Sequence, residues 1–357
     1  MLLQENISIA PLTTLRLGGP ARFFVEAMST GQVEEAVAFA QAKNLPLFVL
    51  GGGSNLVVAD SGWPGLVLKV AIRGIEQHPG NRDDDGRVLF DVGAGEPWDR
   101  FVSYAVRARC AGVECLSGIP GSVGGTPVQN VGAYGQEVSQ TIESVEVFDR
   151  KDGQVRELCR EACGFSYRSS IFNTTERGRF ILLRVTYALV PSGEAHIEYA
   201  DLKRHFEGRE TIPNLAETRE AVRHIRARKG MLIVPGDPDC QSAGSFFKNP
   251  VLTEEQLASL EKRAAAKGLH LPSYPTPAPA AMANSRKVSA AWLVEKSGFA
   301  RGYGFGHVGI SSKHALAIVN RGDATAAEVL ALKDQIEQRV KEIWDVPLEP
   351  EPVLVGF

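Results

Sequence analysis

The segment that most constrains the fold is residues 118–135, which read GIPGSVGGTPVQNVGAYG and hold six glycines and two prolines. Glycine costs about 1 kcal/mol and proline about 3 kcal/mol in a helix interior, so this run predicts a shaped loop rather than a helix. Apolar residues recur through it, at Ile119, Val123, Val128 and Val131. A solvent-exposed linker, the alternative interpretation, would be polar, so we expect the loop to press against a core. Aligned N–H groups in such a loop can hold a phosphate or a flat ring, and Gln129 and Asn130 can add directed hydrogen bonds.

A second glycine loop lies upstream. Here the apolar residues 47–50 lead into Gly51, Gly52, Gly53, Ser54 and Asn55, and residues 56–58 are apolar again. This order predicts a strand, a glycine turn and a second strand. Three consecutive glycines have no Cβ atoms in the way, so backbone N–H groups can surround a diphosphate beside the serine hydroxyl and the asparagine amide. The loop is not a P-loop, because no lysine and hydroxyl residue follow the last glycine. It also lacks the helix that opens within a Rossmann turn.

The composition, 44% hydrophobic and 23% charged, is typical of a soluble globular protein. A formal net charge of −3 without a basic tail argues against a nucleic-acid partner, although residues 219–229 are locally basic. The five cysteines form no C-x-x-C pair and the seven histidines show no metal spacing, so we expect no metal, no disulfide and a cytoplasmic location. No signal peptide or long apolar run is present, so no membrane association is expected. The oligomeric state is left open.

The periodicity of apolar residues predicts an α+β protein. Helices are predicted over residues 31–43, 97–109, 217–229, 253–267, 287–296 and 325–344. Capping boxes open the fourth and the last of these. Strands are predicted over residues 22–26, 47–50, 56–58, 66–70, 88–92, 144–148, 180–190 and 315–319, with a hairpin turn at residues 152–153. The order of elements indicates a first half that holds a cofactor, a smaller α/β lobe and a short C-terminal tail.

Isolated polar residues in apolar or glycine-rich surroundings are the candidates for chemistry. Ser245 precedes two phenylalanines and has no adjacent His or Asp, so it is either a functional hydroxyl or a turn residue. Arg168 either pairs with a ligand carboxylate or bridges a surface acid. Glu351 lies between two prolines near the C-terminus, where most glutamates are solvated. We expect His307 and His314 to be structural or exposed rather than metal ligands.

Several motifs follow one another along nearly the whole chain: TTLRLGG at 13–19, VLGGGSNLVV at 49–58, PGSVGG at 120–125, QNVGAYGQE at 129–137, YRSSIF at 167–172, GSFFKNP at 244–250 and LEPE at 348–351. In this order they resemble the family of UDP-N-acetylenolpyruvoylglucosamine reductases, the flavoenzymes that complete UDP-N-acetylmuramate in peptidoglycan synthesis. The segment EYADL at 198–202 resembles the tyrosine-bearing loop of the type I members. Val353 departs from the pattern, because some members have an arginine two residues after the terminal glutamate.

The resemblance implies a two-lobed FAD-binding domain of the vanillyl-alcohol oxidase (PCMH) type over residues 1–195. A smaller α/β substrate domain over 196–345 and a segment over 346–357 that returns to the active site would follow. FAD would bind without a covalent link, with its pyrophosphate at the first loop and its isoalloxazine near the second. The implied cofactor-binding residues are Gly51, Gly52, Gly53, Ser54, Asn55, Leu56, Pro120, Gly121, Ser122, Gly124, Gly125, Asn130, Gly132, Ala133 and Tyr134. The implied substrate contacts are Tyr199, Lys229, Asn249 and Lys287.

The resemblance also implies a reaction. NADPH would reduce the flavin, and the small-molecule substrate, a UDP-sugar with an enolpyruvyl ether, would then take a hydride at C3. Because hydride addition leaves an enolate, the site needs groups that stabilise negative charge and an acid that protonates C2. By motif match Ser245 is that acid, and Arg168 and Glu351 stabilise the intermediate.

Two alternative functions remain open at this point. One is a flavin oxidase of the same fold that acts on a free alcohol or sugar with oxygen as acceptor. The other is a nucleotide-sugar binding module without a redox role, which would purify colourless. The motifs at 244–250 and 348–351 argue against the oxidase.

Overall fold

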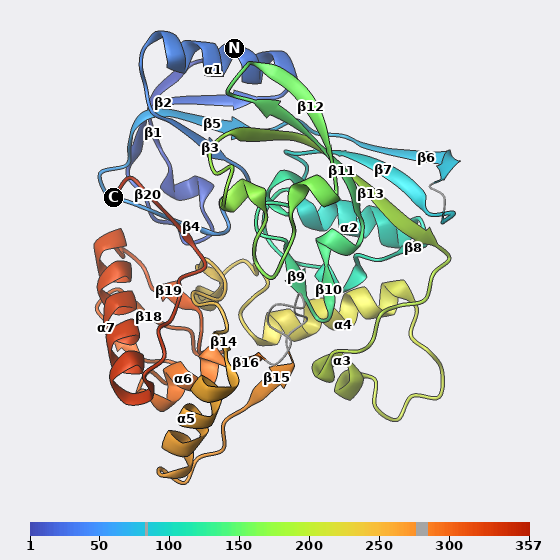
Figure 1. The fold of residues 1–357 in the computed structure, drawn as a ribbon. Helices are drawn as coiled ribbons and strands as arrows, with labels where there is room; N and C mark the ends of the chain where they lie inside the picture. The colour runs from blue at the N-terminus through green and yellow to red at the C-terminus, as the bar shows by residue number, and fades with distance from the viewer. Residues whose placement is uncertain (83–84, 276–284) are drawn as a thin grey trace. The chain divides into compact units, whose positions relative to one another are not determined.

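The computed structural model describes residues 1–82, 85–275 and 285–357 (Figure 1). These residues form two compact units. The first unit comprises Met1–Ser8, Pro20–Gly53 and Trp63–Arg228, and the second comprises Ile9–Gly19, Ser54–Gly62 and Lys229–Phe357. Residues 196–228 therefore belong to the first unit. The domain boundaries expected from the sequence, 1–195, 196–345 and 346–357, stay a prediction.

One sheet of the first unit is mainly parallel. Its strands lie in the order β1 (Gln4–Ser8), β2 (Pro20–Ala27), β5 (Trp63–Val70) and β3 (Leu47–Leu50), and only β1 runs antiparallel to its neighbour. Helix α1 (Thr30–Ala42) packs against β2 and β5. The Ser29 side chain caps its first turn, and Val33, Ala36, Val37 and Ala40 make its buried face. The helix predicted over residues 31–43 and the strand predicted over residues 22–26 are thus confirmed, with bounds that differ by one or two residues.

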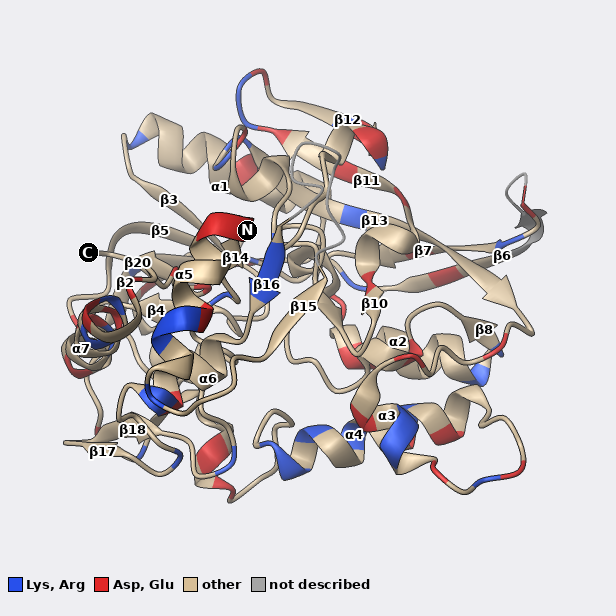
Figure 2. Ribbon diagram, turned by 60° about the horizontal axis from the view of Figure 1, so that its bottom comes forward, with Lys and Arg blue, Asp and Glu red and all other residues tan. Residues whose placement is uncertain are grey.

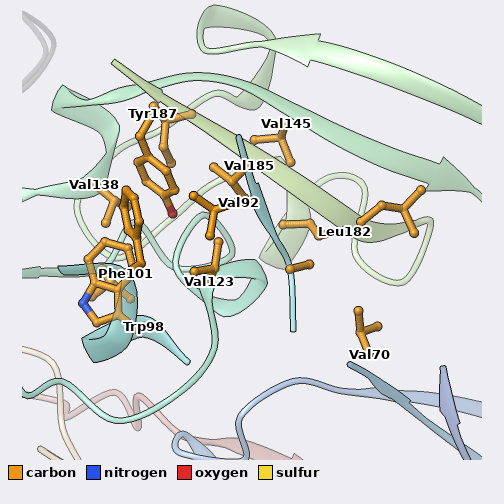
Figure 3. Close-up of a cluster of buried hydrophobic side chains, with 14 of the residues drawn as sticks. Val70, Val92, Trp98, Phe101, Val123, Val138, Val145, Leu182, Val185 and Tyr187 are labelled. Carbon is orange, nitrogen blue, oxygen red and sulfur yellow. The ribbon is translucent and has the colours of Figure 1, made fainter. Parts of the chain in front are cut away.

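The other sheet of the first unit is antiparallel. Its strands are β12 (Gln154–Cys159), β11 (Ile142–Asp149), β13 (Phe180–Pro191), β7 (Val88–Gly93) and β6 (Ile75–Arg82), with β8 (Cys110–Ala111) paired to one end of β13. Helix α2 (Trp98–Arg107) contributes Trp98 and Phe101 to the core beside Tyr187 of β13 (Figure 3). The Phe101 and Tyr187 ring centroids are 4.7 Å apart. Strand β12 was missed by the sequence prediction, because five of its six residues are exposed and carry no apolar alternation.

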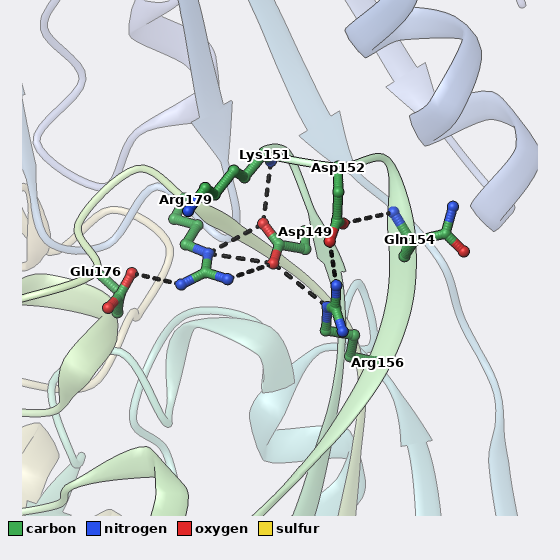
Figure 4. Close-up of polar contacts among 7 residues, drawn as sticks. All are labelled: Asp149, Lys151, Asp152, Gln154, Arg156, Glu176 and Arg179. Atoms are coloured by element: carbon green, nitrogen blue, oxygen red, sulfur yellow. Dashed lines mark hydrogen bonds and ion pairs between the residues drawn. The ribbon is translucent and has the colours of Figure 1, made fainter.

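An ion-pair network fixes the hairpin between β11 and β12 (Figure 4). Asp149, fully buried at the end of β11, accepts hydrogen bonds from the Arg179 guanidinium at 2.7 and 3.1 Å and from the Lys151 N–H at 3.0 Å. Arg156 pairs with both Asp149 and Asp152. The hydrogen bonds from Arg179 hold the pKa of Asp149 at about 2. The hairpin turn predicted at residues 152–153 is confirmed.

The first unit ends in two helices, α3 (Ala200–His205) and α4 (Leu215–Arg228). They enclose a small apolar cluster of Cys115, Tyr134, Leu202, Ala221, Val222 and Ile225. Two short strands, β9 (Gly132–Ala133) and β10 (Gln136–Glu137), pair at the end of the long glycine loop. Among the described residues of both units, 3₁₀ turns lie at Ala10–Leu12, Glu114–Leu116, Val123–Gly125, Val138–Gln140, Glu161–Cys163, Ile171–Asn173 and Pro238–Cys240.

The second unit combines short strands with helices. The strands and α-helices of its described residues are β4 (Leu56–Val58), β14 (Val251–Leu252), α5 (Glu254–Ala265), β15 (Ser273–Pro275), β16 (Arg286–Val288), α6 (Ala290–Lys296), β17 (Gly304–Phe305), β18 (Val308–Ile310), β19 (Ile318–Asn320), α7 (Ala326–Trp344) and β20 (Val353–Val355). Strand β20 pairs in parallel with β4, which returns the C-terminal tail to residues 56–58. The core gathers Phe246, Phe247, Leu293, Ile336 and Trp344, all buried.

The helix predictions in this unit are confirmed with one correction. Capping boxes at Thr253 and Thr325 open α5 and α7 as expected. The helix predicted over residues 287–296 begins only at Ala290, because the Ser289 side chain caps it and the preceding residues form β16. No helix in the described ranges is long and apolar enough to cross a membrane.

Candidate active site

The two glycine loops meet at the backbone in the first unit. A Cβ atom built on Gly52 would lie 2.4 Å from the Cα atom of Gly121 and 2.6 Å from the N atom of Ser122. One built on Gly51 would lie 3.0 Å from the Ser122 Oγ. Gly53 has a φ of 65°, which an L side chain rarely adopts. This contact requires glycine, and we call residues 51–53 and 121–125 the glycine cradle.

Backbone hydrogen bonds hold the downstream loop against the start of α2. The Trp98 N–H donates to the Gly121 carbonyl at 3.1 Å, and the Gly124 N–H donates to the Ala94 carbonyl at 2.8 Å. Val123 is fully buried, and Ile119 and Val128 pack on the same core. The Thr126 hydroxyl lies 2.8 Å from the hydroxyl of the buried Tyr187, whose pKa burial raises. The loop is therefore shaped and pressed against a core, as its sequence predicts.

The cradle fits a flavin dinucleotide. The Ser122 Oγ is buried and has no hydrogen-bond partner in the part of the chain that the structure describes. Within the same described ranges, the N–H groups of Gly51, Gly52 and Gly53 donate no hydrogen bond, so they remain available to a phosphate. A Cβ atom on Gly125 would meet no atom within 4 Å, so this glycine faces open space. Donors without protein partners beside open space are what an anionic or heteroaromatic ligand needs.

Asn130 serves the loop itself. Its Nδ2 donates to the Glu137 carboxylate at 2.9 Å and to the Ser166 carbonyl at 3.1 Å, and its Oδ1 accepts from the Ser139 N–H at 3.1 Å. The residue is buried, with a φ of 44°. Both amide hydrogens are used within the chain, so any contribution of this side chain to a cofactor comes through the loop that it shapes. Its place in the cofactor-binding set stays a prediction.

Arg168 lies beside the predicted cofactor residues. It has a left-handed φ of 54°, and its guanidinium donates to the Gly132 carbonyl at 2.9 Å. It also lies over the Tyr167 ring, 5.6 Å from the centroid. Gly132 and Ala133 form β9, so the arginine is tied to the end of the glycine loop by a direct hydrogen bond.

Tyr134 and Tyr199 pack edge to face in the first unit. Their ring centroids are 5.3 Å apart at an interplanar angle of 80°. Tyr134 is nearly buried, whereas Tyr199 is 44% exposed. The sequence around Tyr199 predicts no helix, and this prediction is wrong from Ala200 onward, because Tyr199 is the N-cap residue of α3 and Leu202 is buried in the adjoining cluster. Burial lowers the pKa of Arg226 on α4, and a hydrogen bond with Tyr134 opposes that shift.

A charged clamp at the start of the long loop was not predicted. Asp99 of α2 accepts the Gly118 N–H at 2.6 Å, a paired contact from Arg219 at 2.6 and 2.8 Å and a hydrogen bond from Arg223 at 3.0 Å. Burial alone would raise the pKa of Asp99, but the hydrogen bonds from Arg219 and Gly118 outweigh it and lower the pKa. Figure 2 shows the basic residues of α4, the segment that the sequence marks only as locally basic.

Ser245 belongs to the second unit and is half-buried. The next residue, Phe246, is fully buried and donates its N–H to the Leu316 carbonyl at 2.7 Å. The Ser245 Oγ lies 3.5 Å from the His314 Nε2. The absence of an adjacent histidine in sequence therefore did not exclude one in space.

Glu351 is positioned next to Ser245 by the main chain. Its N–H donates to the Phe246 carbonyl at 2.9 Å, and its own carbonyl accepts the Asn55 side-chain amide at 3.1 Å. The Val353 N–H donates to the Asn55 carbonyl at 2.9 Å, so Asn55 holds the C-terminal tail on both sides. We call Ser245, Phe246, His314, Leu316 and Glu351 the serine site. Arg168, the third predicted catalytic residue, belongs to the first unit.

The other predicted residues of the second unit occupy structured positions. Asn249 accepts the Ala290 N–H at 2.9 Å and so helps to start α6. Lys287 lies on β16 opposite Val251 and Tyr274. Lys229 directly follows α4 and is the first residue of the segment counted with this unit. The Ser54 carbonyl accepts the Thr14 hydroxyl at 3.3 Å, and Leu56 pairs with Val353.

Comparison with known proteins decides the family. The profile of an FAD binding domain matches residues 21–158, and that of the UDP-N-acetylenolpyruvoylglucosamine reductase C-terminal domain matches residues 237–355. A UDP-N-acetylenolpyruvoylglucosamine reductase of Thermobifida fusca is 44% identical over 99% of this chain and 98% of its own length. One of Streptomyces coelicolor is 45% identical over 99% of this chain and 90% of its own. The chain belongs to the UDP-N-acetylenolpyruvoylglucosamine reductase family.

A solved structure of this family supports the assignment along the whole chain. The crystal structure of UDP-N-acetylenolpyruvylglucosamine reductase from Thermus caldophilus superposes with a TM-score of 0.64 at 29% identity, covering 99% of this chain and all of that one. The expected fold class, an α+β FAD-binding domain followed by a smaller reductase domain, is confirmed. The residues matched by the FAD binding domain profile, 21–158, include the glycine cradle.

The glycine cradle and Ser245 were predicted from the sequence, but the residues that contact and position them were not. Asp99, Arg219 and Arg223 carried no motif, because a clamp between two helices is a tertiary feature. The i, i+4 spacing of the two arginines on one predicted helix was the one available signal. The sequence predicts that His314 is structural or exposed rather than a metal ligand, and its position 3.5 Å from the Ser245 Oγ depends on tertiary structure.

Proposed function

We propose that this chain is an NADPH-dependent flavoenzyme that reduces the enolpyruvyl group of UDP-N-acetylenolpyruvoylglucosamine to give UDP-N-acetylmuramate for peptidoglycan precursor synthesis in the cytoplasm. The observation that carries the proposal is the placement of Ser245, a hydroxyl within reach of a histidine nitrogen and held beside Glu351 by backbone hydrogen bonds. Oxidation of an alcohol requires removal of a proton from the substrate, whereas reduction of an enol ether requires delivery of one. A positioned hydroxyl suits the reduction.

The residues proposed to hold FAD are those of the glycine cradle with their neighbours. The N–H groups of Gly51, Gly52 and Gly53 would face the pyrophosphate, and the Ser122 hydroxyl would donate to or accept from the flavin dinucleotide. The chemistry that a bound FAD supplies is hydride transfer, from NADPH and then to C3 of the enolpyruvyl group. The cradle contains no histidine or cysteine, and the nearby Cys115 is buried with its thiol donating to the His196 carbonyl at 3.0 Å. We therefore propose that FAD is bound without a covalent link.

The protein's own task in the second step is to manage charge and a proton. A hydride added at C3 leaves negative charge over C2 and the carboxylate, and the product forms only when C2 receives a proton. We assign this proton to Ser245. A serine hydroxyl is a weak acid, but an enolate is a strong base, which makes the transfer feasible.

The remaining roles follow the family motifs. Arg168 is proposed to stabilise the enolate with its positive charge. Glu351 is proposed to contribute to the same stabilisation, for which its carboxyl must be protonated or paired, since a bare carboxylate would repel the developing charge. Tyr199, Lys229, Asn249 and Lys287 are proposed to contact the substrate, with the two cations suited to its diphosphate.

An absorbance spectrum followed by anaerobic mixing tests this function. We expect purified protein to show the visible bands of oxidised flavin, to bleach on mixing with NADPH, and to regain colour when UDP-N-acetylenolpyruvoylglucosamine is then added. A colourless protein that binds UDP-sugars would instead support a binding module. A flavin that is bleached by an alcohol and regains its colour with oxygen, but not with the enolpyruvyl substrate, would support an oxidase.

Acid precipitation tests the mode of flavin attachment. All of the flavin should appear in the supernatant after denaturation. Yellow colour that remains in the pellet would show a covalent link and contradict the proposal.

A further inference from the structure

The His314 ring lies between a backbone N–H and the Ser245 hydroxyl. Its Nδ1 accepts the Leu316 N–H at 3.1 Å, and its Nε2 lies 3.5 Å from the Ser245 Oγ. A backbone N–H is always a donor, so the ring nitrogen that it contacts has to act as an acceptor. Nδ1 therefore carries no proton in this arrangement. The acceptor role of Nδ1 places the ring hydrogen on Nε2, on the side of the serine oxygen.

The loop that carries His314 is braced at several points. The Ser311 Oγ accepts the N–H groups of Lys313 at 3.0 Å and of His314 at 3.2 Å. The Asp239 carboxylate accepts the Ser312 N–H at 2.8 Å and its hydroxyl at 2.6 Å. These contacts fix the backbone on the N-terminal side of the histidine. The ring is thus presented from a segment with little freedom to turn.

The same segment also fixes the serine. The Leu316 residue donates its N–H to the His314 ring and accepts the Phe246 N–H on its carbonyl at 2.7 Å. Ser245 precedes Phe246 directly, so one residue determines both the tautomer of the histidine and the position of the serine. Because Leu316 contacts both the His314 ring and the residue after Ser245, it fixes the distance between the two side chains.

We propose that His314 is a positioning residue for Ser245, donating its Nε2–H to the Ser245 Oγ during protonation of the substrate. The inference rests on the proposed function, in which Ser245 is the proton donor. With a donor on one side of its oxygen, the serine O–H is turned away from the ring and toward the ligand. As the O–H bond breaks and the C2–H bond forms, the serine oxygen becomes negative, and the hydrogen bond from Nε2 strengthens against that charge. Water returns the proton to the serine after the product leaves.

Paired substitutions at His314 test the role. His314→Leu removes the donor, and His314→Gln keeps an amide N–H on a side chain of similar reach. A hydrogen bond to a developing charge is worth about 10- to 100-fold in rate, so H314L should slow recolouring of the reduced flavin by the enolpyruvyl substrate by about that factor. H314Q should recover part of the loss. Flavin bleaching by NADPH should keep its rate in both variants.

A matched control separates this effect from a general loss of a histidine. His307 belongs to the same unit, is 62% exposed and pairs with Glu328, so His307→Gln should leave both half-reactions unchanged. Equal slowing of both half-reactions in H314Q would show that His314 supports the fold or the flavin and would overturn the proposal. An unchanged recolouring rate in H314L would overturn it as well.

A double substitution distinguishes failure of this inference from failure of the proposed function. If His314 acts through Ser245, then H314L should cost less than about twofold when added to Ser245→Ala. Multiplicative effects of the two substitutions would overturn the inference while leaving the function intact. If S245A alone leaves recolouring unchanged, the proton-donor assignment itself fails.

The tautomer provides a readout that does not depend on activity. In protein labelled with ¹⁵N at histidine, the ring signals that disappear in H314Q identify His314. They should show a protonated Nε2 and an unprotonated Nδ1 at neutral pH, with or without FAD. A ring protonated on Nδ1, or on both nitrogens, would overturn the inference directly.

Discussion

The first unit prepares its candidate cofactor site with the main chain, whereas the second unit prepares its candidate proton donor with side chains. The two loops of the glycine cradle can approach each other only because glycine has no Cβ atom. A Cβ atom on Gly52 would lie 2.4 Å from the Cα atom of Gly121. In the serine site, the Ser245 hydroxyl lies 3.5 Å from the His314 imidazole, and a backbone hydrogen bond joins Glu351 to Phe246. The difference matches the roles proposed for the two sites, because a dinucleotide would be held along its length and a proton would be delivered at one atom.

The two regions also differ in how they tolerate change. Atoms added to the glycine cradle meet either the facing backbone or the open space beside it, so small substitutions there should act on the stability of the fold or on cofactor retention. Removing atoms from the serine site leaves the backbone hydrogen bonds in place, so small substitutions there should act on one chemical step.

The largest effect is expected for Ser245→Ala. Losing a positioned general acid typically costs about 10²- to 10⁴-fold, or roughly 3–5 kcal/mol of barrier. Only the recolouring of reduced flavin by substrate should slow, since flavin reduction by NADPH forms no carbanion. Anaerobic stopped-flow absorbance follows the two steps separately. Equal slowing of both would mean that the serine supports the fold or the flavin, and the contrast between the regions would disappear.

The glycine cradle should respond to two alanine substitutions in different ways. Gly52→Ala would drive a Cβ into the Gly121 backbone, so it should lower the free energy of unfolding by about 1–3 kcal/mol even without FAD. Gly125→Ala meets no protein atom within 4 Å, so the apoprotein should keep its stability. If FAD occupies that open space, G125A should still weaken FAD binding.

Urea unfolding of the apoproteins and fluorescence titration with FAD measure these two quantities. Gly31→Ala is the matched control, because a Cβ there also meets nothing and the residue lies in α1, where alanine should stabilise by roughly 0.5–1 kcal/mol. Normal FAD affinity in G125A would show that the open space is not used by the cofactor.

A smaller, pH-dependent effect is expected away from both sites, at Asp149. Hydrogen bonds from Arg179 hold its folded pKa at about 2, below the value of about 3.9 for an unfolded aspartate. A depressed carboxyl pKa stabilises the fold fully above the unfolded pKa, and the contribution is lost as the pH falls from about 4 toward 2. Asp149→Asn should therefore lower stability at neutral pH and flatten the acid side of the unfolding profile in this window. An unchanged profile, measured by urea unfolding at each pH, would contradict the role of this network.

The sequence predicted the two regions unequally for a physical reason. The cradle is visible because glycine and proline forbid helix and strand over residues 118–135, and because residues 47–58 alternate between apolar strand and glycine turn. The capping boxes at Thr253 and Thr325 are equally local, and both were confirmed. Strand β12 and helix α3 were missed because the exposed residues of the strand and the short helix carry little periodicity.

The serine site could be predicted only through resemblance to a family. Nothing near Ser245 in the sequence announces His314 or Glu351, since the hydrogen bonds that join them come from tertiary pairing of residues 246, 316 and 351. The clamp of Asp99 with Arg219 and Arg223 was missed for the same reason, being formed across about 120 residues. The local sequence pattern predicts helices, strands and turns, whereas contacts between side chains far apart in the sequence depend on the topology of the fold.

The smallest effect is expected for Tyr199→Phe. The Tyr199 ring packs edge to face on Tyr134 with centroids 5.3 Å apart, and phenylalanine keeps that contact and the start of α3 while removing only the hydroxyl. If the hydroxyl binds the substrate, its loss should raise the Michaelis constant for the enolpyruvyl substrate by about two- to tenfold, the worth of one neutral hydrogen bond. Flavin reduction by NADPH should stay unchanged. Tyr104→Phe, which removes a hydroxyl from α2 in the same unit, should change neither quantity. If Y199F slowed both half-reactions equally, the Tyr199 hydroxyl would stabilise the Tyr134 contact and the glycine loop. Tyr199 would then support the cofactor site rather than contact the substrate.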